Sequence, residues 1–179
     1  MIPYFVIHSF TDKLFGGNPA GVCLLMEWID QSLMQRIAYE NDLSETAFFV
    51  PKDGCYELRW FTPKIEVDLC GHATLASAFV LFEELGYQGD VIVFRTQSGD
   101  LHVSRSGSSL VMDFPSRPPE KTESPKNLRR ALNAPFKEVH KSADLLVVFD
   151  SEMTINDLNP DFSEIAQLDC SGLIVTAPG

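Results

Sequence analysis

The sequence has few cysteines, few basic residues and no long hydrophobic run, and each shortage excludes a class of protein. Its 179 residues include four cysteines, none of them in a Cys-x-x-Cys pair, and their spacing matches no zinc template. Lys and Arg number 14 against 25 Asp and Glu, which gives a net charge of −11. Such a surface repels nucleic acid and anionic membranes, so both are poor partners. No apolar run approaches the roughly 20 residues of a membrane span.

The composition is that of a globular protein. Hydrophobic residues make up 45% of the chain and charged residues 22%, enough for a sizeable core. The first residues, Met1 to Tyr4, lack the basic segment of a secretory signal. Together with the scattered cysteines, this predicts reduced, mostly structural thiols in a cytoplasmic protein.

The order of the expected elements indicates an α+β fold. Strand-like runs precede and follow one helix, at about residues 72–85, whose apolar residues occupy every face. A helix of this kind must be enclosed by protein, which favours a highly curved mixed sheet wrapped around it. Residues 115–125 are rich in proline, lysine, glutamate and serine, which is typical of a linker. We therefore expect an N-terminal α+β domain over residues 1–115, then a linker and a partial second domain over residues 116–179.

Hydrophobic runs bounded by turn residues give the expected elements. The strands of the first domain cover residues 3–10, 20–26, 45–51, 55–62, 91–96, 100–105 and 109–114, and Asp30 is expected to cap a helix that ends near residue 40. In the remainder we expect a helix at 125–132, a strand at 143–149, helical turns within 151–167 and a strand at 171–176.

One run of sequence, TPKIEVDLCGHAT at residues 62–74, joins an expected strand to the apolar helix. Its small and polar residues fall at a helix N-terminus, where unpaired backbone N–H groups and the positive end of the dipole can hold a carboxylate. Gly71, His72 and Ala73 are therefore predicted to bind substrate. Gly71 would let a ligand approach the backbone closely, although simple turn geometry also explains a glycine here.

A second run, NDLSETAF at residues 41–48, places Glu45 between polar neighbours at the start of a strand. On its own such a glutamate is more often a solvent-facing side chain. Together with the first run, it predicts a small-molecule site in which Glu45 is the general acid/base, because one carboxylate shielded from water can both remove and return a proton. Ser44 is a candidate substrate-binding neighbour.

Two further polar side chains have alternative explanations. His72 can donate a hydrogen bond to substrate or assist proton movement, and the helix dipole should favour its neutral form; the alternative is a histidine satisfied by the backbone. Asn18, in a Gly-Asn-Pro run, can point its amide toward the site or merely stabilise its own turn, and the residue type favours the turn.

Three runs carry a resemblance to a known family. GNPAGV at 17–22, NDLSETAFF at 41–49 and RWFTPKIEVDLCGHATLASA at 59–78 resemble the PhzF-like phenazine-biosynthesis isomerases, which have the diaminopimelate-epimerase-like fold. The resemblance is dense over residues 1 to about 115 and loose beyond. It implies two pseudo-symmetric halves with the active site between them, Glu45 as acid/base and Gly71-His72 as the substrate-binding pair. It also implies a cofactor-independent, metal-free isomerase, often homodimeric.

The resemblance leaves two alternatives open. The family's later Asp-Pro-x-Thr-Gly-Ser-type run does not occur in these 179 residues, so we expect a fragment or a truncated form, and a non-catalytic protein that binds small carboxylates is one alternative. The position that matches Cys70 is a catalytic cysteine in diaminopimelate epimerases, so a two-base amino-acid racemase is the other. Cys170 lies in no matching motif, which favours a structural Cys70. The sequence does not specify the substrate.

Overall fold

The first unit, Met1–Phe114, is built on one eight-stranded sheet in the computed structural model, which describes residues 1–13 and 15–179. Its elements are β1 (Tyr4–Ser9), β2 (Asn18–Leu24), α1 (Gln31–Asn41), β3 (Glu45–Lys52), β4 (Cys55–Phe61), β5 (Glu66–Val67), α2 (Gly71–Phe79), a π-helical turn (Val80–Glu84), β6 (Val91–Thr96), β7 (Gly99–Ser106) and β8 (Ser109–Asp113). The strand order is β1-β2-β3-β4-β6-β7-β8, with β5 paired to β4.

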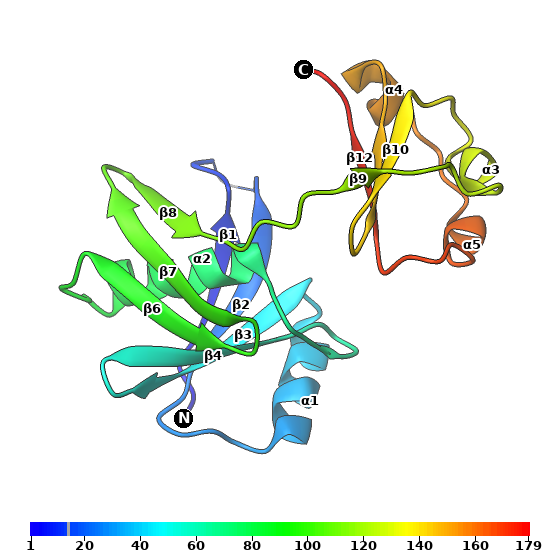
Figure 1. Cartoon of the computed structure of the whole chain (residues 1–179). Helices are drawn as coiled ribbons and strands as arrows, with labels where there is room; N and C mark the ends of the chain where they lie inside the picture. The colour runs from blue at the N-terminus through cyan, green and yellow to red at the C-terminus, as the bar shows by residue number, and fades with distance from the viewer. Residues whose placement is uncertain (14) are drawn as a thin grey trace. The chain divides into compact units, whose positions relative to one another are not determined.

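The sheet is mixed and curls around α2 (Figure 1). The β2–β3 and β4–β6 pairs are parallel, whereas β1–β2, β3–β4, β6–β7 and β7–β8 are antiparallel. A curled mixed sheet around one central helix is the α+β arrangement predicted from the sequence, and that prediction is confirmed.

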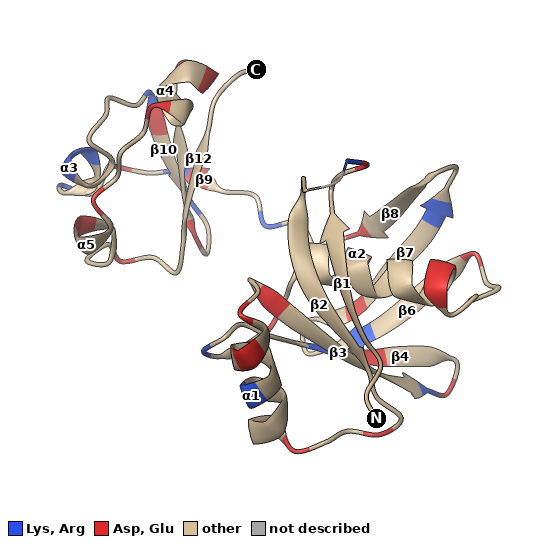
Figure 2. Cartoon of the chain, turned by 180° about the vertical axis from the view of Figure 1, so that it is seen from behind, with Lys and Arg blue, Asp and Glu red and all other residues tan. Residues whose placement is uncertain are grey.

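Helix α2 is buried because almost nothing on it requires water. The stretch Gly71–Phe82 contains no Asp, Glu, Lys or Arg, and α2 is drawn in tan, the colour of residues other than these four, in Figure 2. Its two buried hydroxyls bond within the helix: Thr74 Oγ1 donates to the Cys70 carbonyl at 2.6 Å, and Ser77 Oγ donates to the Ala73 carbonyl at 2.8 Å. A buried polar side chain satisfied in this way costs little, so the helix can be enclosed.

On the opposite face of the sheet, α1 packs against β3 and β4. Asp30 caps this helix as predicted, since its carboxylate accepts from the Ser32 N–H at 2.8 Å. Strand β3 separates the two cores: Phe49 packs with the α2 side, whereas Phe48 packs with the buried Met34 of α1. Both faces of β3 are therefore buried, which explains its continuous apolar run.

The second unit, Pro115–Gly179, has a separate four-stranded sheet in the order β12-β11-β10-β9. Its elements are β9 (Glu120–Lys121), α3 (Leu128–Leu132), β10 (Glu138–Lys141), β11 (Leu145–Val148), α4 (Glu152–Asn156), α5 (Phe162–Ile165) and β12 (Leu173–Thr176). The strands predicted at 143–149 and 171–176 correspond to β11 and β12, whereas β9 and β10 were missed. Strand β10 lacks the usual apolar pattern, because three of its four residues are polar or charged and only Val139 is buried.

Charged residues are spread over both units (Figure 2). None of the helices within residues 1–13 and 15–179 has the length and apolar character needed to cross a membrane.

Candidate functional site

Strand pairing brings distant parts of the sequence to one edge of the first sheet. Strands β1 and β2 are antiparallel and pair Ser9 with Asn18, while β2 and β3 are parallel and pair Ala20 with Glu45. The end of β1 and the starts of β2 and β3 therefore lie at the same edge. The start of α2 is fixed there, because Ser9 Oγ donates a 2.7 Å hydrogen bond to the His72 carbonyl.

Glu45 and His72 face each other at this edge. Oε2 of Glu45 lies 3.2 Å from Nε2 of His72, and their side chains are 20% and 9% exposed. The two atoms do not form a hydrogen bond of normal geometry, and Nε2 is buried without such a partner among the described residues. A buried polar atom left in this state costs free energy until a ligand or a small movement satisfies it. The pair is thus arranged to receive a polar group.

The environment of His72 favours a neutral ring. Burial lowers the pKa of His72, against the opposing effects of the Glu45 carboxylate and the Pro19 carbonyl, which raise it. The sequence also predicts a neutral imidazole, from the helix dipole; in the structure the main cause is removal of the ring from water. Near pH 7 the ring can therefore donate one hydrogen bond and accept another.

Cys70 completes a cluster with these two side chains. It is the N-cap residue of α2, and its Sγ lies 3.4 Å from Nδ1 of His72. Mainly through burial, the pKa of the Cys70 thiol is raised to about 12; the Ala73 N–H opposes this rise and the nearby Glu45 carboxylate contributes to it. A thiol activated by a helix N-terminus would show the opposite direction. Cys70 is therefore a neutral thiol at physiological pH.

The first turn of α2 has free donors. Cys70 supplies no side-chain cap, and the first helical bond runs from Thr74 N to the Cys70 carbonyl. Across residues 1–13 and 15–179, no acceptor is recorded for the backbone N–H of Gly71 or His72. They are two of the three amides, Gly71 to Ala73, that were predicted to hold a carboxylate; the third, the Ala73 N–H, is directed at the Cys70 thiol.

Gly71 is not required by local backbone geometry. It does not adopt positive φ, and a Cβ built on it would only touch Met112 Cε at 3.6 Å and Phe114 Cζ at 3.9 Å, which is ordinary contact. Of the two explanations for this glycine, turn geometry finds no support. Close approach of a ligand to the backbone remains the prediction.

The approach to α2 is fixed by an ion pair. Arg59 of β4 donates Nε–H and an Nη2–H to the two carboxylate oxygens of Glu66 in β5, each at 2.7 Å. Its guanidinium also lies 5.4 Å from the centre of the Trp28 ring. Strand β5 leads within a few residues to Cys70, so this bidentate pair anchors the segment that enters the site.

The other two predicted site residues, Asn18 and Ser44, are less clearly connected to this site. Asn18 begins β2 rather than forming a turn, and the turn before it depends on Gly17, whose φ is +70°. Ser44 is exposed and precedes β3 by one residue. No side-chain hydrogen bond is recorded between either residue and the other members of the site within the described part of the chain.

Sequence reasoning missed Ser9 and the Pro19 carbonyl, which both contact His72. Their roles depend on the pairing of β1 with β2. Ser9 stands at the end of an ordinary strand, and no local signal distinguishes it.

Two other groupings bear on ligand binding. Glu45, Cys70 and His72 each have a possible metal-ligand atom within 4.8 Å of those of the other two, which is close enough for the three to share a metal ion.

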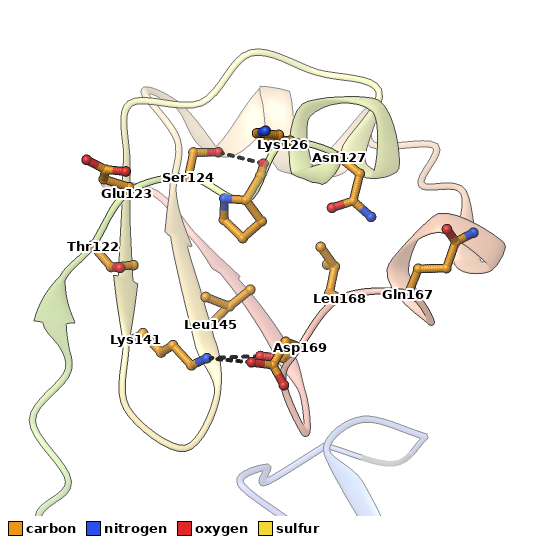
Figure 3. Close-up of a pocket in the computed structure, with 11 residues that line it drawn as sticks. Thr122, Glu123, Ser124, Lys126, Asn127, Lys141, Leu145, Gln167, Leu168 and Asp169 are labelled. Carbon is orange, nitrogen blue, oxygen red and sulfur yellow. Dashed lines mark hydrogen bonds and ion pairs between the residues drawn. The ribbon is translucent and has the colours of Figure 1, made fainter.

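A hollow of about 440 Å³ lies in the second unit, with Thr122 and the ion-paired Lys141 and Asp169 among its lining residues (Figure 3). It is lined only by the second unit and contains none of the predicted site residues.

Comparison with known proteins gives consistent matches over nearly the whole chain. The sequence model of the PhzC-PhzF family, described as phenazine biosynthesis-like protein, matches residues 7–179. Two Pseudomonas aeruginosa proteins described as uncharacterized isomerases are 53% and 44% identical; the matches cover 97% and 99% of this chain and 67% and 69% of those proteins. A crystal structure of a PhzF-family phenazine biosynthesis protein from Enterococcus faecalis matches with TM-score 0.92 at 43% identity, over 98% of this chain and 68% of that chain. The chain thus spans about two thirds of the length of these relatives.

Proposed function

This chain belongs to the phenazine biosynthesis-like protein family, as its three motifs predicted, and we propose that it carries the proton-transfer site of an isomerase that acts on small carboxylate-bearing molecules. Glu45 removes a proton from a carbon beside an unsaturated or carboxylate-bearing group and returns it to another carbon of the same molecule. No cofactor is needed, because one carboxylate performs both steps. The observation that supports this most strongly is the half-buried Glu45 carboxylate 3.2 Å from the unpartnered Nε2 of His72.

The neighbouring groups have distinct roles in this proposal. Because the Cys70 thiol keeps its proton, it donates to Nδ1 of His72, which leaves the ring proton on Nε2, beside Glu45. That N–H donates to a substrate oxygen as negative charge develops there. The free N–H groups of Gly71 and His72 hold the substrate carboxylate at the positive end of α2.

A two-base racemase that uses Cys70 is the less favoured alternative. Such a base must be ionised to accept a proton from carbon, and burial raises the pKa of this thiol to about 12. The two proposals differ in their response to Cys70→Ala. Replacement of a racemase base abolishes turnover, whereas loss of the hydrogen bond to Nδ1 reduces the isomerase rate only modestly.

Solvent isotope exchange tests the role of Glu45. The chain is incubated in D₂O with a panel of small unsaturated carboxylates and α-amino acids, and deuterium at carbon is followed by NMR. Glu45→Gln should reduce exchange by about 100-fold or more, since it removes the general base. Glu40→Gln, an exposed glutamate of α1, is the matched control and should exchange like the unmodified chain.

Two outcomes contradict the proposal. Undiminished exchange by Glu45→Gln removes this residue from the mechanism. Binding of the carboxylates with no exchange by the unmodified chain supports the non-catalytic alternative.

Homodimer formation, the other implication of the family resemblance, remains a prediction that native mass measurement tests.

A further inference from the structure

We propose that Glu45, Cys70 and His72 form a binding site for a soft divalent cation such as Zn²⁺, which acts as an inhibitor of this site rather than as a cofactor. The three side chains come from the start of β3 and the first turn of α2. They supply a carboxylate oxygen, a sulfur and an imidazole nitrogen, the three donor types that zinc prefers.

The spacing of the donor atoms fits a tetrahedral ion. Bonds of about 2.0–2.3 Å to nitrogen, oxygen and sulfur hold neighbouring ligand atoms roughly 3.3–3.8 Å apart. Oε2 of Glu45 and Nε2 of His72 are already 3.2 Å apart, close to the lower end of this range. Glu45, Cys70 and His72 each offer one donor atom within 4.8 Å of the other two, so rotation of these side chains would close the site around an ion.

The protein alone does not satisfy this cluster. The His72 side chain is only 9% exposed, and Nε2 faces Glu45 without a hydrogen bond of normal geometry within the described residues. Contacts that merely stabilised the fold would be expected to pair these groups with each other or with the backbone. A buried set of donors with an unpartnered member is suited to bind an ion or a substrate, and its sulfur selects for a soft ion.

Charge balance supports binding despite the nearby helix N-terminus, which disfavours cations. The ion forms a Zn–S bond as the Cys70 S–H bond breaks, and the proton passes to water. The bound ion's two positive charges are then matched by the thiolate and the Glu45 carboxylate, with neutral His72 as third ligand. The net charge of −11 on the whole chain also favours an incoming cation.

Cobalt absorption tests the site without any assay of activity. Co²⁺ titrated into the whole chain should give one equivalent of tetrahedral visible bands together with thiolate charge-transfer absorption, and Zn²⁺ should displace it. Cys70→Ala should abolish the charge-transfer band. Cys23→Ala is the matched control, because Cys23 is also a buried thiol but packs on the α1 side of the sheet, and it should leave the spectrum unchanged. Glu45→Gln should weaken Co²⁺ binding by about tenfold or more, as loss of a ligand does.

Several results would overturn the proposal: no thiolate band, a band that survives Cys70→Ala, or a band lost equally in Cys23→Ala. If Cys70→Ala fails to fold, X-ray absorption of Zn²⁺ bound to the unmodified chain decides instead, since the site requires one sulfur and at least two nitrogen or oxygen neighbours. The inhibitory consequence rests on the proposed role of Glu45, but the binding site does not. A chain that binds Co²⁺ through Cys70 while Glu45→Gln keeps full isotope exchange would retain the metal site and lose the proposed function.

Discussion

Oε2 of Glu45 and Nε2 of His72 lie 3.2 Å apart, although the two residues belong to different motifs and different elements. The contact depends on the curled sheet, which brings the start of β3 to the start of the enclosed helix α2. One further bond, from Ser9 Oγ to the His72 carbonyl, fixes the helix start against β1. The acid, the imidazole and the free amides of α2 are thereby placed at one edge of the sheet.

Gly71→Ala should separate stability from binding. The backbone of Gly71 is not in the positive-φ region and a Cβ has room, so the variant should unfold in urea within about 1 kcal/mol of the unmodified chain. The added methyl group would nevertheless obstruct a carboxylate at the adjacent amides, and binding of small carboxylates should weaken at least about tenfold, which is about 1.4 kcal/mol. Equal affinity in the variant would mean that no ligand approaches this backbone.

Arg59→Lys should lower the free energy of unfolding by about 1–2 kcal/mol, because a single ammonium cannot make the two parallel bonds to Glu66 or stack on Trp28 in the same way. The side chains of Arg59 and Glu66 are 23% and 15% exposed, so solvent screens this pair only in part.

Lys52→Ala is the control for Arg59→Lys. The Lys52–Glu57 pair spans 4.0 Å, and its lysine side chain is 53% exposed, so its loss should cost no more than about 0.5 kcal/mol. Urea unfolding of both variants checks the difference. Equal small effects would show that the Arg59 pair does not hold β5 in place.

Alkaline pH should destabilise the first unit through Cys23. Burial raises the pKa of this thiol from 9.0 to about 12, so the folded state keeps the proton where the unfolded chain has lost it. The stability contributed by the neutral thiol is complete below about pH 9 and is lost progressively as pH rises toward 12. The slope is at most about 1.4 kcal/mol per pH unit.

Cys23→Ala removes this contribution and should show a shallower fall in the free energy of unfolding between pH 8 and 10.5, measured in urea. The variant is also less stable at neutral pH, because it loses the packing of a buried side chain. The change with pH in each protein is therefore measured from its own free energy of unfolding at neutral pH. Parallel pH profiles for the two proteins would contradict the assigned cause.

The sequence predicted those parts of the site that are encoded locally. Glu45 follows a helix-to-strand connection in which Asn41 Nδ2 donates to Thr46 Oγ1 and Asp42 takes the left-handed conformation, so the motif itself specifies where β3 begins. Gly71 and His72 were recognisable because an apolar, uncharged helix follows them. Most strands of the first unit were found for the same reason, since their apolar runs are bounded by turn residues.

The parts that the sequence did not predict depend on contacts between distant residues. Ser9 reaches His72 only because of the register between β1 and β2, and the sequence of neither strand alone specifies that register. Strand β10 was missed because the one side chain it buries completely, Val139, stands among charged residues. The pKa of Cys70 rises because burial outweighs the helix N-terminus, and burial is a property of the folded core.

The central claim is that the first turn of α2 holds a carboxylate in front of Glu45, and amide NMR tests it most directly. The ¹⁵N-labelled chain is titrated with a small dicarboxylate while the backbone N–H signals are followed. If the claim holds, the shifts are saturable, are largest at Gly71 and His72 and are lost in Gly71→Ala. Shifts confined to other residues, such as the hollow around Lys141 and Asp169, or no saturable shift at Gly71 and His72, would contradict it.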